Sequence, residues 1–154
     1  MPLITFIILY PLLWLFSILP MRILYFFSDI LFLIVYYVVG YRKDVVRQNL
    51  QLSFPDKSRK ELLELEKKSI RHFIDQFVEL IKSFTITEKE LTQRLSLTNH
   101  ESLEPYYNED KSVIFISGHY ANWEWVPFIV QSRMNYHLSV VYKKLANPYF
   151  DKLI

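Results

Sequence analysis

The chain contains no cysteine and only two glycines, Gly40 and Gly118, among its 154 residues. Without cysteine, a disulfide scaffold, a cysteine-based zinc site and thiol catalysis are all excluded. The scarcity of glycine excludes a Gly-rich phosphate-binding loop. The formal net charge of +2 lacks the basic excess that nucleic-acid binding usually needs. We therefore predict no nucleic-acid partner, no metal and no cofactor.

Apolar residues are abundant instead. The hydrophobic fraction is 51% and the aromatic fraction 17%, both high for a soluble domain, and the excess lies in the first forty residues. Two apolar runs, 3–19 and 23–39, are separated by Pro20, Met21 and Arg22. Each run is near the lower limit of about 17 to 20 residues that cross a hydrocarbon core. Both runs could span as a hairpin, or one could span or insert while the other lies in the interface.

Other readings of this apolar region are weaker. A secretory signal is disfavoured because no basic segment precedes the run and no small-residue cleavage site follows it. A buried pair of core helices is disfavoured because little chain remains to cover it. Asp29 lies inside the second run, where a carboxylate needs a partner or water, and we expect it to be locally satisfied rather than catalytic.

Basic residues follow the apolar region directly, at Arg42, Lys43 and Arg47. Positive residues close to a membrane segment favour the cytoplasmic side. The sequence thus predicts a membrane anchor in residues 1–41 and a cytoplasm-facing part in residues 42–154. The partner of the anchor is the bilayer.

Two capping boxes predict helix starts. Ser58 with Glu61 precedes a long run of apolar residues spaced three and four apart, which predicts an amphipathic helix reaching Phe84. We expect its aromatic stripe to pack in a core rather than on a membrane. Thr87 with Glu90 opens a shorter helix to about Leu95.

The rest of the chain predicts strands alternating with helices. Residues 113–116 form an apolar run rich in β-branched side chains, typical of a buried parallel strand. Short strands are also expected at 95–98 and 138–142, with helices at 101–107 and from Asn122 to about residue 132. This alternation predicts an α/β fold with a mostly parallel sheet.

The chemically suggestive segment is 117–124, which begins where the predicted strand 113–116 ends. Reacting groups in open α/β sheets gather at the carboxyl ends of strands, and Gly118 permits a sharp turn before His119. Imidazole is the usual proton acceptor near neutral pH. Glu124, five residues later, could curl back to one imidazole nitrogen and leave the other facing a substrate hydroxyl. The spacing alone is weak evidence, because a solvated His–Glu pair is common.

At this point the chain resembles the bacterial lipid A biosynthesis acyltransferases, the lauroyl and myristoyl transferases that add secondary acyl chains to a lipid A precursor. Four stretches carry the resemblance: the anchor with Arg47-Gln48-Asn49-Leu50 and Phe54-Pro55; Phe77-Val78-Glu79-Leu80; Ser117-Gly118-His119 with Asn122-Trp123-Glu124; and Val141-Tyr142-Lys143 with Asn147-Pro148-Tyr149. The resemblance implies membrane helices followed by part of a glycerolipid-acyltransferase-like α/β domain.

The same resemblance implies roles for particular residues. His119 would deprotonate an acceptor hydroxyl, which attacks an acyl thioester, usually on acyl carrier protein, and Glu124 would complete the pair. Substrate-binding residues would be Asn122, Trp123, Lys143 and Asn147. The lipid acceptor and the acyl donor would be the partners, and the location would be the cytoplasmic face of the inner membrane.

The sequence departs from the family pattern in two ways. Lys143 stands where arginine is frequent, which keeps the charge but loses the bidentate geometry. Family members are also nearly twice as long, so we interpret the chain as a truncated copy and expect little activity from it alone. Two alternatives stay open: a glycerophospholipid or aminolipid acyltransferase, and a non-catalytic membrane-tethered fragment.

Overall fold

The computed structural model describes residues 1–153, and the chain divides into two compact units. One unit comprises residues 19–82, and the other comprises residues 1–18 together with the chain from Ser83 onward. The elements are α1 (Pro2–Ile18), α2 (Met21–Leu33), the π-helical η1 (Ile34–Val39), α3 (Lys43–Ser53), α4 (Arg59–Lys82), α5 (Glu88–Arg94), the 3-10 turn η2 (His100–Leu103), α6 (Glu104–Asn108), the 3-10 turn η3 (Trp123–Trp125), α7 (Val126–Arg133) and α8 (Pro148–Asp151).

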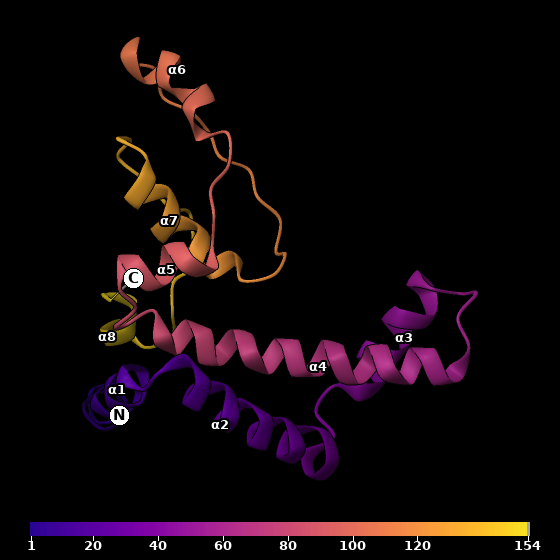
Figure 1. Cartoon of the computed structure of the whole chain (residues 1–154). Coiled ribbons are helices and arrows are strands. Elements are labelled where there is room, and N and C mark those ends of the chain that lie inside the picture. The colour runs from indigo at the N-terminus through magenta and orange to yellow at the C-terminus, as the bar shows by residue number, and fades with distance from the viewer. Residues whose placement is uncertain (154) are drawn as a thin grey trace. The chain divides into compact units, whose positions relative to one another are not determined.

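The unit of residues 19–82 is built around α4, with α2 and α3 packed against it (Figure 1). Side chains on α4 spaced four apart, Ile70, Ile74 and Val78, are buried. Ile70 and Ile74 pack with Phe32 of α2 and Tyr36 of η1 in one cluster. The core therefore forms along the i, i+4 row of α4, as the sequence pattern of an amphipathic helix predicts.

The aromatic stripe of α4 does not form the core, contrary to the sequence-based expectation. Phe73 and Phe77 are 41% and 51% exposed, whereas the aliphatic row beside them is covered. The aliphatic row faces α2, and this places the aromatic row at the rim of the helix pair.

The capping box at the start of α4 is confirmed. The Ser58 N–H donates to Oε2 of Glu61 over 2.9 Å, and the Glu61 N–H donates to Oγ of Ser58 over 3.4 Å. The hydrogen bond from the Ser58 hydroxyl, followed by that from its backbone amide, lowers the pKa of the Glu61 carboxyl. The second box, between Thr87 and Glu90, is also formed. Both predicted helix starts are thus correct.

Replacing Ser58 with alanine should destabilise the unit of residues 19–82 by about 1 kcal/mol, because a helix amide loses its cap. Ser69 is an exposed serine inside the same helix, so Ser69→Ala is the matched control and should be neutral or slightly stabilising. Chemical unfolding in detergent micelles, followed by circular dichroism, measures both. Equal effects of the two variants would show that the cap contributes nothing.

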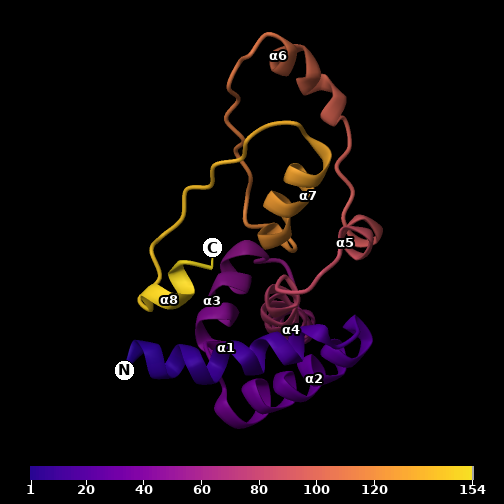
Figure 2. The ribbon, with the colours of Figure 1, turned by 90° about the vertical axis from the view of Figure 1, so that its left-hand side faces the viewer.

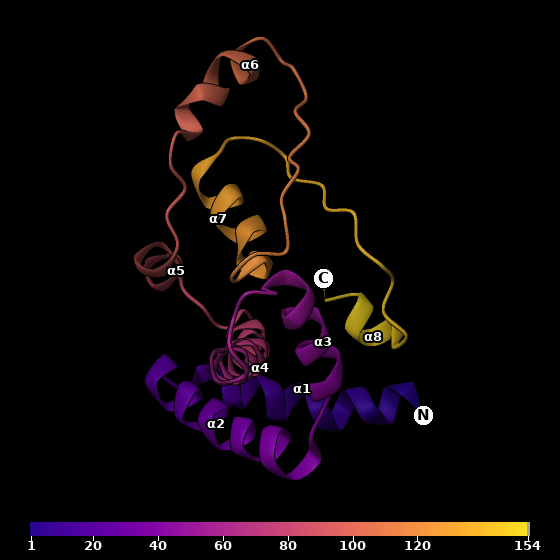
Figure 3. The same ribbon diagram turned by 90° about the vertical axis from the view of Figure 1, so that its right-hand side faces the viewer.

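The other unit is held by aromatic contacts and by buried residues of its short helices. Phe6 of α1 packs edge-on against Phe150 of α8, with ring centroids 5.1 Å apart. Leu91 of α5 and Ile129 of α7 are buried, and these two helices lie in contact. Long irregular segments connect α6 to α7 and α7 to α8 (Figures 2 and 3).

The predicted α/β fold with a mostly parallel sheet is wrong, because residues 1–153 are helical or irregular and contain no strand. Segments 95–98, 113–116 and 138–142 lie in irregular connections. Ile114 and Ile116 are 91% and 92% exposed, and Val141 is fully exposed. Apolar, β-branched runs favour an extended backbone, but a strand also needs a neighbour to complete its hydrogen-bond ladder. In the described structure these runs have no such neighbour.

The apolar N-terminal region forms two helices. α2 and η1 make a continuous helix, Met21–Val39, of 19 residues with a mean hydropathy of 1.8, long and apolar enough to cross a membrane. It is the single such helix within residues 1–153, because α1 is apolar but shorter. Gly40 ends this helix in the left-handed region at φ 68°, where glycine avoids the strain of a side chain. The prediction that residues 1–41 serve as the anchor stays a prediction.

Candidate active site

His119 lies at the end of the irregular segment that precedes η3. The Tyr120 N–H donates to the carbonyl oxygen of Gly118 over 2.9 Å, and Ala121 adopts a left-handed backbone with φ 49°. The sharp turn is thus made at Ala121 rather than at Gly118. A Cβ at Gly118 would meet no atom within 4 Å, so the approach to His119 is open on that side.

Asn122 begins the helix that carries Glu124, as the sequence predicts. Its Oδ1 accepts a hydrogen bond from the Trp125 N–H over 3.2 Å, which satisfies one of the free amides at the helix start. Trp125 is buried, and its indole N–H donates to Oγ of Ser83 over 3.1 Å. The cap and the buried indole together fix the turn on which Glu124 sits.

His119, Trp123 and Glu124 are brought together. The His119 imidazole lies against the Trp123 indole with centroids 4.2 Å apart and the planes tilted by 54°. Burial raises the pKa of the Glu124 carboxyl, and the nearby His119 partly offsets this. No hydrogen bond joins His119 to Glu124 in the described part of the chain. The imidazole is exposed, and the indole is the group in contact with it.

Lys143 and Asn147 lie in a different part of the same unit. Lys143 is exposed in the irregular segment before α8. Asn147 caps α8 by accepting from the Tyr149 N–H over 3.0 Å, and its Nδ2 donates to the Pro2 carbonyl oxygen over 3.0 Å. Asn147 therefore ties α8 to the start of α1. Its side chain is occupied by these structural bonds.

Two features of this site were not predicted from the sequence. The sequence does not indicate that the Trp123 ring contacts the His119 imidazole, and the role of Trp123 in substrate binding stays a prediction. Ser83 was not singled out at all, although it anchors Trp125 from 42 residues away. No sequence pattern reports a hydrogen bond between side chains that far apart. Within residues 1–153 no group of three or more histidine and carboxylate side chains could hold a metal ion.

The raised pKa of Glu124 predicts a pH-dependent contribution to stability. In the folded state Glu124 holds its proton to a higher pH than in the unfolded state, so folding is favoured most below the ordinary glutamate pKa. This contribution is lost as the pH rises through the folded-state pKa. Glu124→Gln removes it, so the variant should gain stability relative to the parent chain as the pH is raised from 4 towards 7. Urea titrations across that pH range measure the difference, and a difference independent of pH would contradict the assignment.

Comparison with known proteins adds one clear match. A family model described as bacterial lipid A biosynthesis acyltransferase matches residues 2–154. No curated protein and no solved structure is significantly similar to the chain. The matched residues include all of the candidate site, from His119 to Asn147.

Proposed function

Because the chain belongs to the bacterial lipid A biosynthesis acyltransferase family, we propose that it moves a fatty acyl chain from an acyl thioester to a hydroxyl of a lipid A precursor. The observation that carries the proposal at residue level is the grouping of an exposed imidazole, an indole in contact with it and a carboxylate of raised pKa. Such a grouping fits a general base with a partner that orients it. The proposed donor is acyl carrier protein or another acyl thioester, and no cofactor is required.

In the proposed reaction, one nitrogen of His119 accepts the proton of the acceptor hydroxyl as its oxygen attacks the thioester carbonyl carbon. A C–O bond forms, and a tetrahedral intermediate carries the negative charge on the former carbonyl oxygen. The C–S bond then breaks, and the proton passes from the imidazole to the leaving thiolate. The products are an ester and a free thiol, so neither an oxidant nor a reductant is needed.

The contact with Trp123 gives the imidazole a rigid support. Glu124 can act as the orienter by accepting a hydrogen bond from the imidazole nitrogen that does not face the substrate. The two groups are not bonded in this structure, and catalytic hydrogen bonds often tighten only when substrate is bound. Ionised Glu124 would stabilise the imidazolium formed during attack, as the acidic residue does in a serine protease triad.

Lys143 offers a cation for an anionic part of the lipid acceptor, and the proposed location is the cytoplasmic face of the inner membrane. The basic residues after the apolar helix, Arg42, Lys43 and Arg47, support a location against anionic headgroups. Asn122 and Asn147 contribute by holding helix starts in place, a role that their hydrogen bonds support.

The proposal is tested by supplying the purified chain, in detergent or vesicles, with a radiolabelled acyl carrier protein thioester and a lipid A precursor. Formation of an acylated precursor is the expected result, and single-turnover conditions keep a slow reaction measurable. Lysophosphatidic acid and an aminolipid are the competing acceptors. Acylation of either of these, with the lipid A precursor untouched, would refute the assigned acceptor. Thioester hydrolysis without ester formation would refute the transfer reaction.

A further inference from the structure

The apolar helix Met21–Val39 is joined to α4 by a row of polar contacts. The Tyr25 hydroxyl donates to Oε1 of Glu79, and the Ser28 hydroxyl donates to Oδ1 of Asp75. Further along, Arg71 Nε donates to Oδ1 of Asp29 over 3.0 Å. The Tyr36 hydroxyl donates to Oε1 of Glu66 over 2.9 Å. We call these four pairs the polar seam, and their order shows that the two helices run antiparallel.

The polar seam joins two helices of opposite character. Four of the six polar or tyrosine side chains of the apolar helix lie in the seam, the exceptions being Arg22 and Tyr37. Each seam partner is a charged residue of α4. α4 also carries Lys67 and Lys68 within the same stretch and Glu64 just before it. The apolar helix therefore cannot enter the bilayer core in a spanning orientation without either breaking the seam or taking charged residues of α4 along.

Both of those routes are costly. With the seam intact, the ion pair of Asp29 and Arg71, each about half exposed, would lie near the middle of the membrane. A charged side chain at that depth is strongly disfavoured, and α4 carries several more. With the seam broken, Ser28 and Asp29 would enter hydrocarbon without their partners.

The opposite face of the apolar helix is suited to lipid. Ile23, Phe26, Ile30, Leu33 and Tyr37 recur at spacings of three and four and are 40% to 61% exposed. We call these five residues the outer face. A contiguous apolar face of this length is unusual on a surface bathed only by water.

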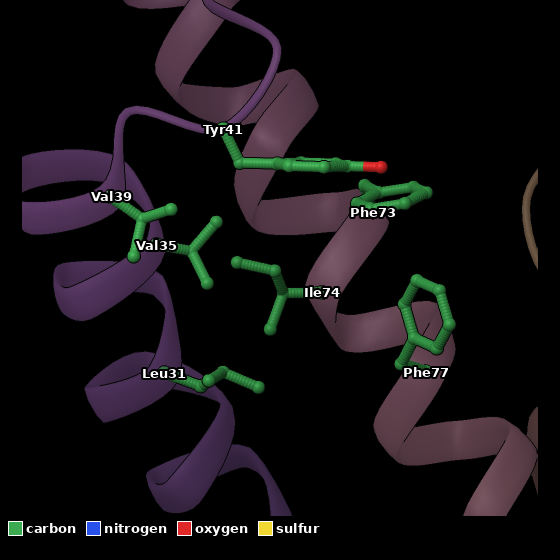
Figure 4. Close-up of a pocket in the computed structure, with 7 residues that line it drawn as sticks. All are labelled: Leu31, Val35, Val39, Tyr41, Phe73, Ile74 and Phe77. Atoms are coloured by element: carbon green, nitrogen blue, oxygen red, sulfur yellow. The ribbon is translucent and has the colours of Figure 1, made fainter.

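A separate apolar groove lies between the two helices. The groove has a volume of about 280 Å³ and is lined by Leu31, Val35, Val39, Tyr41, Phe73, Ile74 and Phe77. Figure 4 shows Leu31 and Val35 pointing towards Ile74, with the Tyr41 ring lying flat over Phe73. The groove brings the exposed aromatic rings of α4 next to the apolar side chains of the other helix.

Basic side chains stand at both ends of the outer face. Arg22 precedes it and Arg42 follows it, and both are exposed. A basic residue at a membrane surface is attracted by anionic lipid headgroups. The positive charge at the two ends of the outer face thus complements anionic headgroups. This indicates that the partner of the outer face is an anionic bilayer.

From these observations we infer that Met21–Val39 lies in the plane of an anionic membrane, with its outer face in one leaflet and α4 on the water side, rather than crossing the bilayer. The polar seam prevents crossing, because it binds the helix to a charged neighbour from Tyr25 to Tyr36. This inference concerns residues 19–82 alone and does not depend on the proposed reaction.

The absence of native cysteine allows a direct test. Single cysteines replace Ile23, Ile30 and Tyr37, seven residues apart on the outer face, and each carries a nitroxide label. The full chain is reconstituted into vesicles of phosphatidylethanolamine and phosphatidylglycerol at three to one. Depth is measured from collisions with oxygen and with a water-soluble nickel complex. Lys68→Cys, on the charged side of α4, is the control for a label in water.

The expected result is the same shallow depth at all three positions, about 5 to 10 Å below the headgroups. A spanning helix would instead place Ile30 near the midplane, about 15 Å deep, with Ile23 and Tyr37 near opposite surfaces. That profile would overturn the inference. Labels at all three positions that behave like the Lys68→Cys control would overturn it equally. Helix content by circular dichroism confirms that each labelled variant is folded.

Discussion

His119→Ala should lower the rate of acyl transfer by about 10²- to 10⁴-fold, the usual contribution of a positioned general base. The physical reason is that the acceptor hydroxyl, with a pKa far above neutrality, then loses its proton only to water. The imidazole is exposed and its chief contact is the Trp123 ring, so its removal should leave the fold intact. Single-turnover transfer from a labelled thioester donor measures the change.

The matched control is His137→Ala, an exposed histidine of the same unit that lies in an irregular segment outside the site. Its rate should equal that of the parent chain. A rate for His119→Ala within a factor of two of the control would exclude His119 as the base. Glu124→Gln should give an intermediate loss, because the base remains but its orienter is no longer charged.

Local patterns predicted the helical part of this structure well. The capping boxes at Ser58 and Thr87 form as expected, and Asn122 caps the turn that leads into α7. Each of these signals acts within a few residues, where side-chain chemistry and backbone hydrogen bonds determine each other. α3 was not expected, because its apolar residues are few and no capping motif precedes it.

The predicted sheet is wrong because strand formation depends on pairing with a segment that can lie far away in the sequence. Residues 113–116 have the composition of a buried strand, yet Ile114 and Ile116 are exposed on an irregular backbone. Composition reports a preference for extended backbone, whereas pairing depends on a distant neighbour whose presence it does not report. The arrangement of side chains in the candidate site was likewise not predictable from local patterns. The spacing of His119 and Glu124 predicted a pair. The ring contact of His119 with Trp123 and the hydrogen bond from Trp125 to Ser83 are visible only in the folded structure.

Glu66→Ala should destabilise the unit of residues 19–82 by about 3 kcal/mol, since breaking a buried charged network is among the costliest single changes. Glu66 is 1% exposed and accepts hydrogen bonds from the Tyr36 hydroxyl and, in bidentate fashion, from Arg47 over 2.9 Å and 3.3 Å. The hydrogen bond to Glu66 raises the pKa of Arg47 further, so the guanidinium stays charged. These bonds join α3, α4 and η1 at one carboxylate.

The loss should be smaller than that of a fully buried ion pair, because the Arg47 side chain is 47% exposed and can turn to water when its partner is removed. The Tyr36 hydroxyl cannot turn to water in the same way, because Tyr36 is only 4% exposed. Asp29→Ala is the control, since it breaks a half-exposed pair on the same two helices and should cost about 1 kcal/mol or less. Urea unfolding in detergent micelles measures both variants. Equal losses would show that burial adds nothing to the Glu66 network, and the polar seam would then be a set of independent surface contacts.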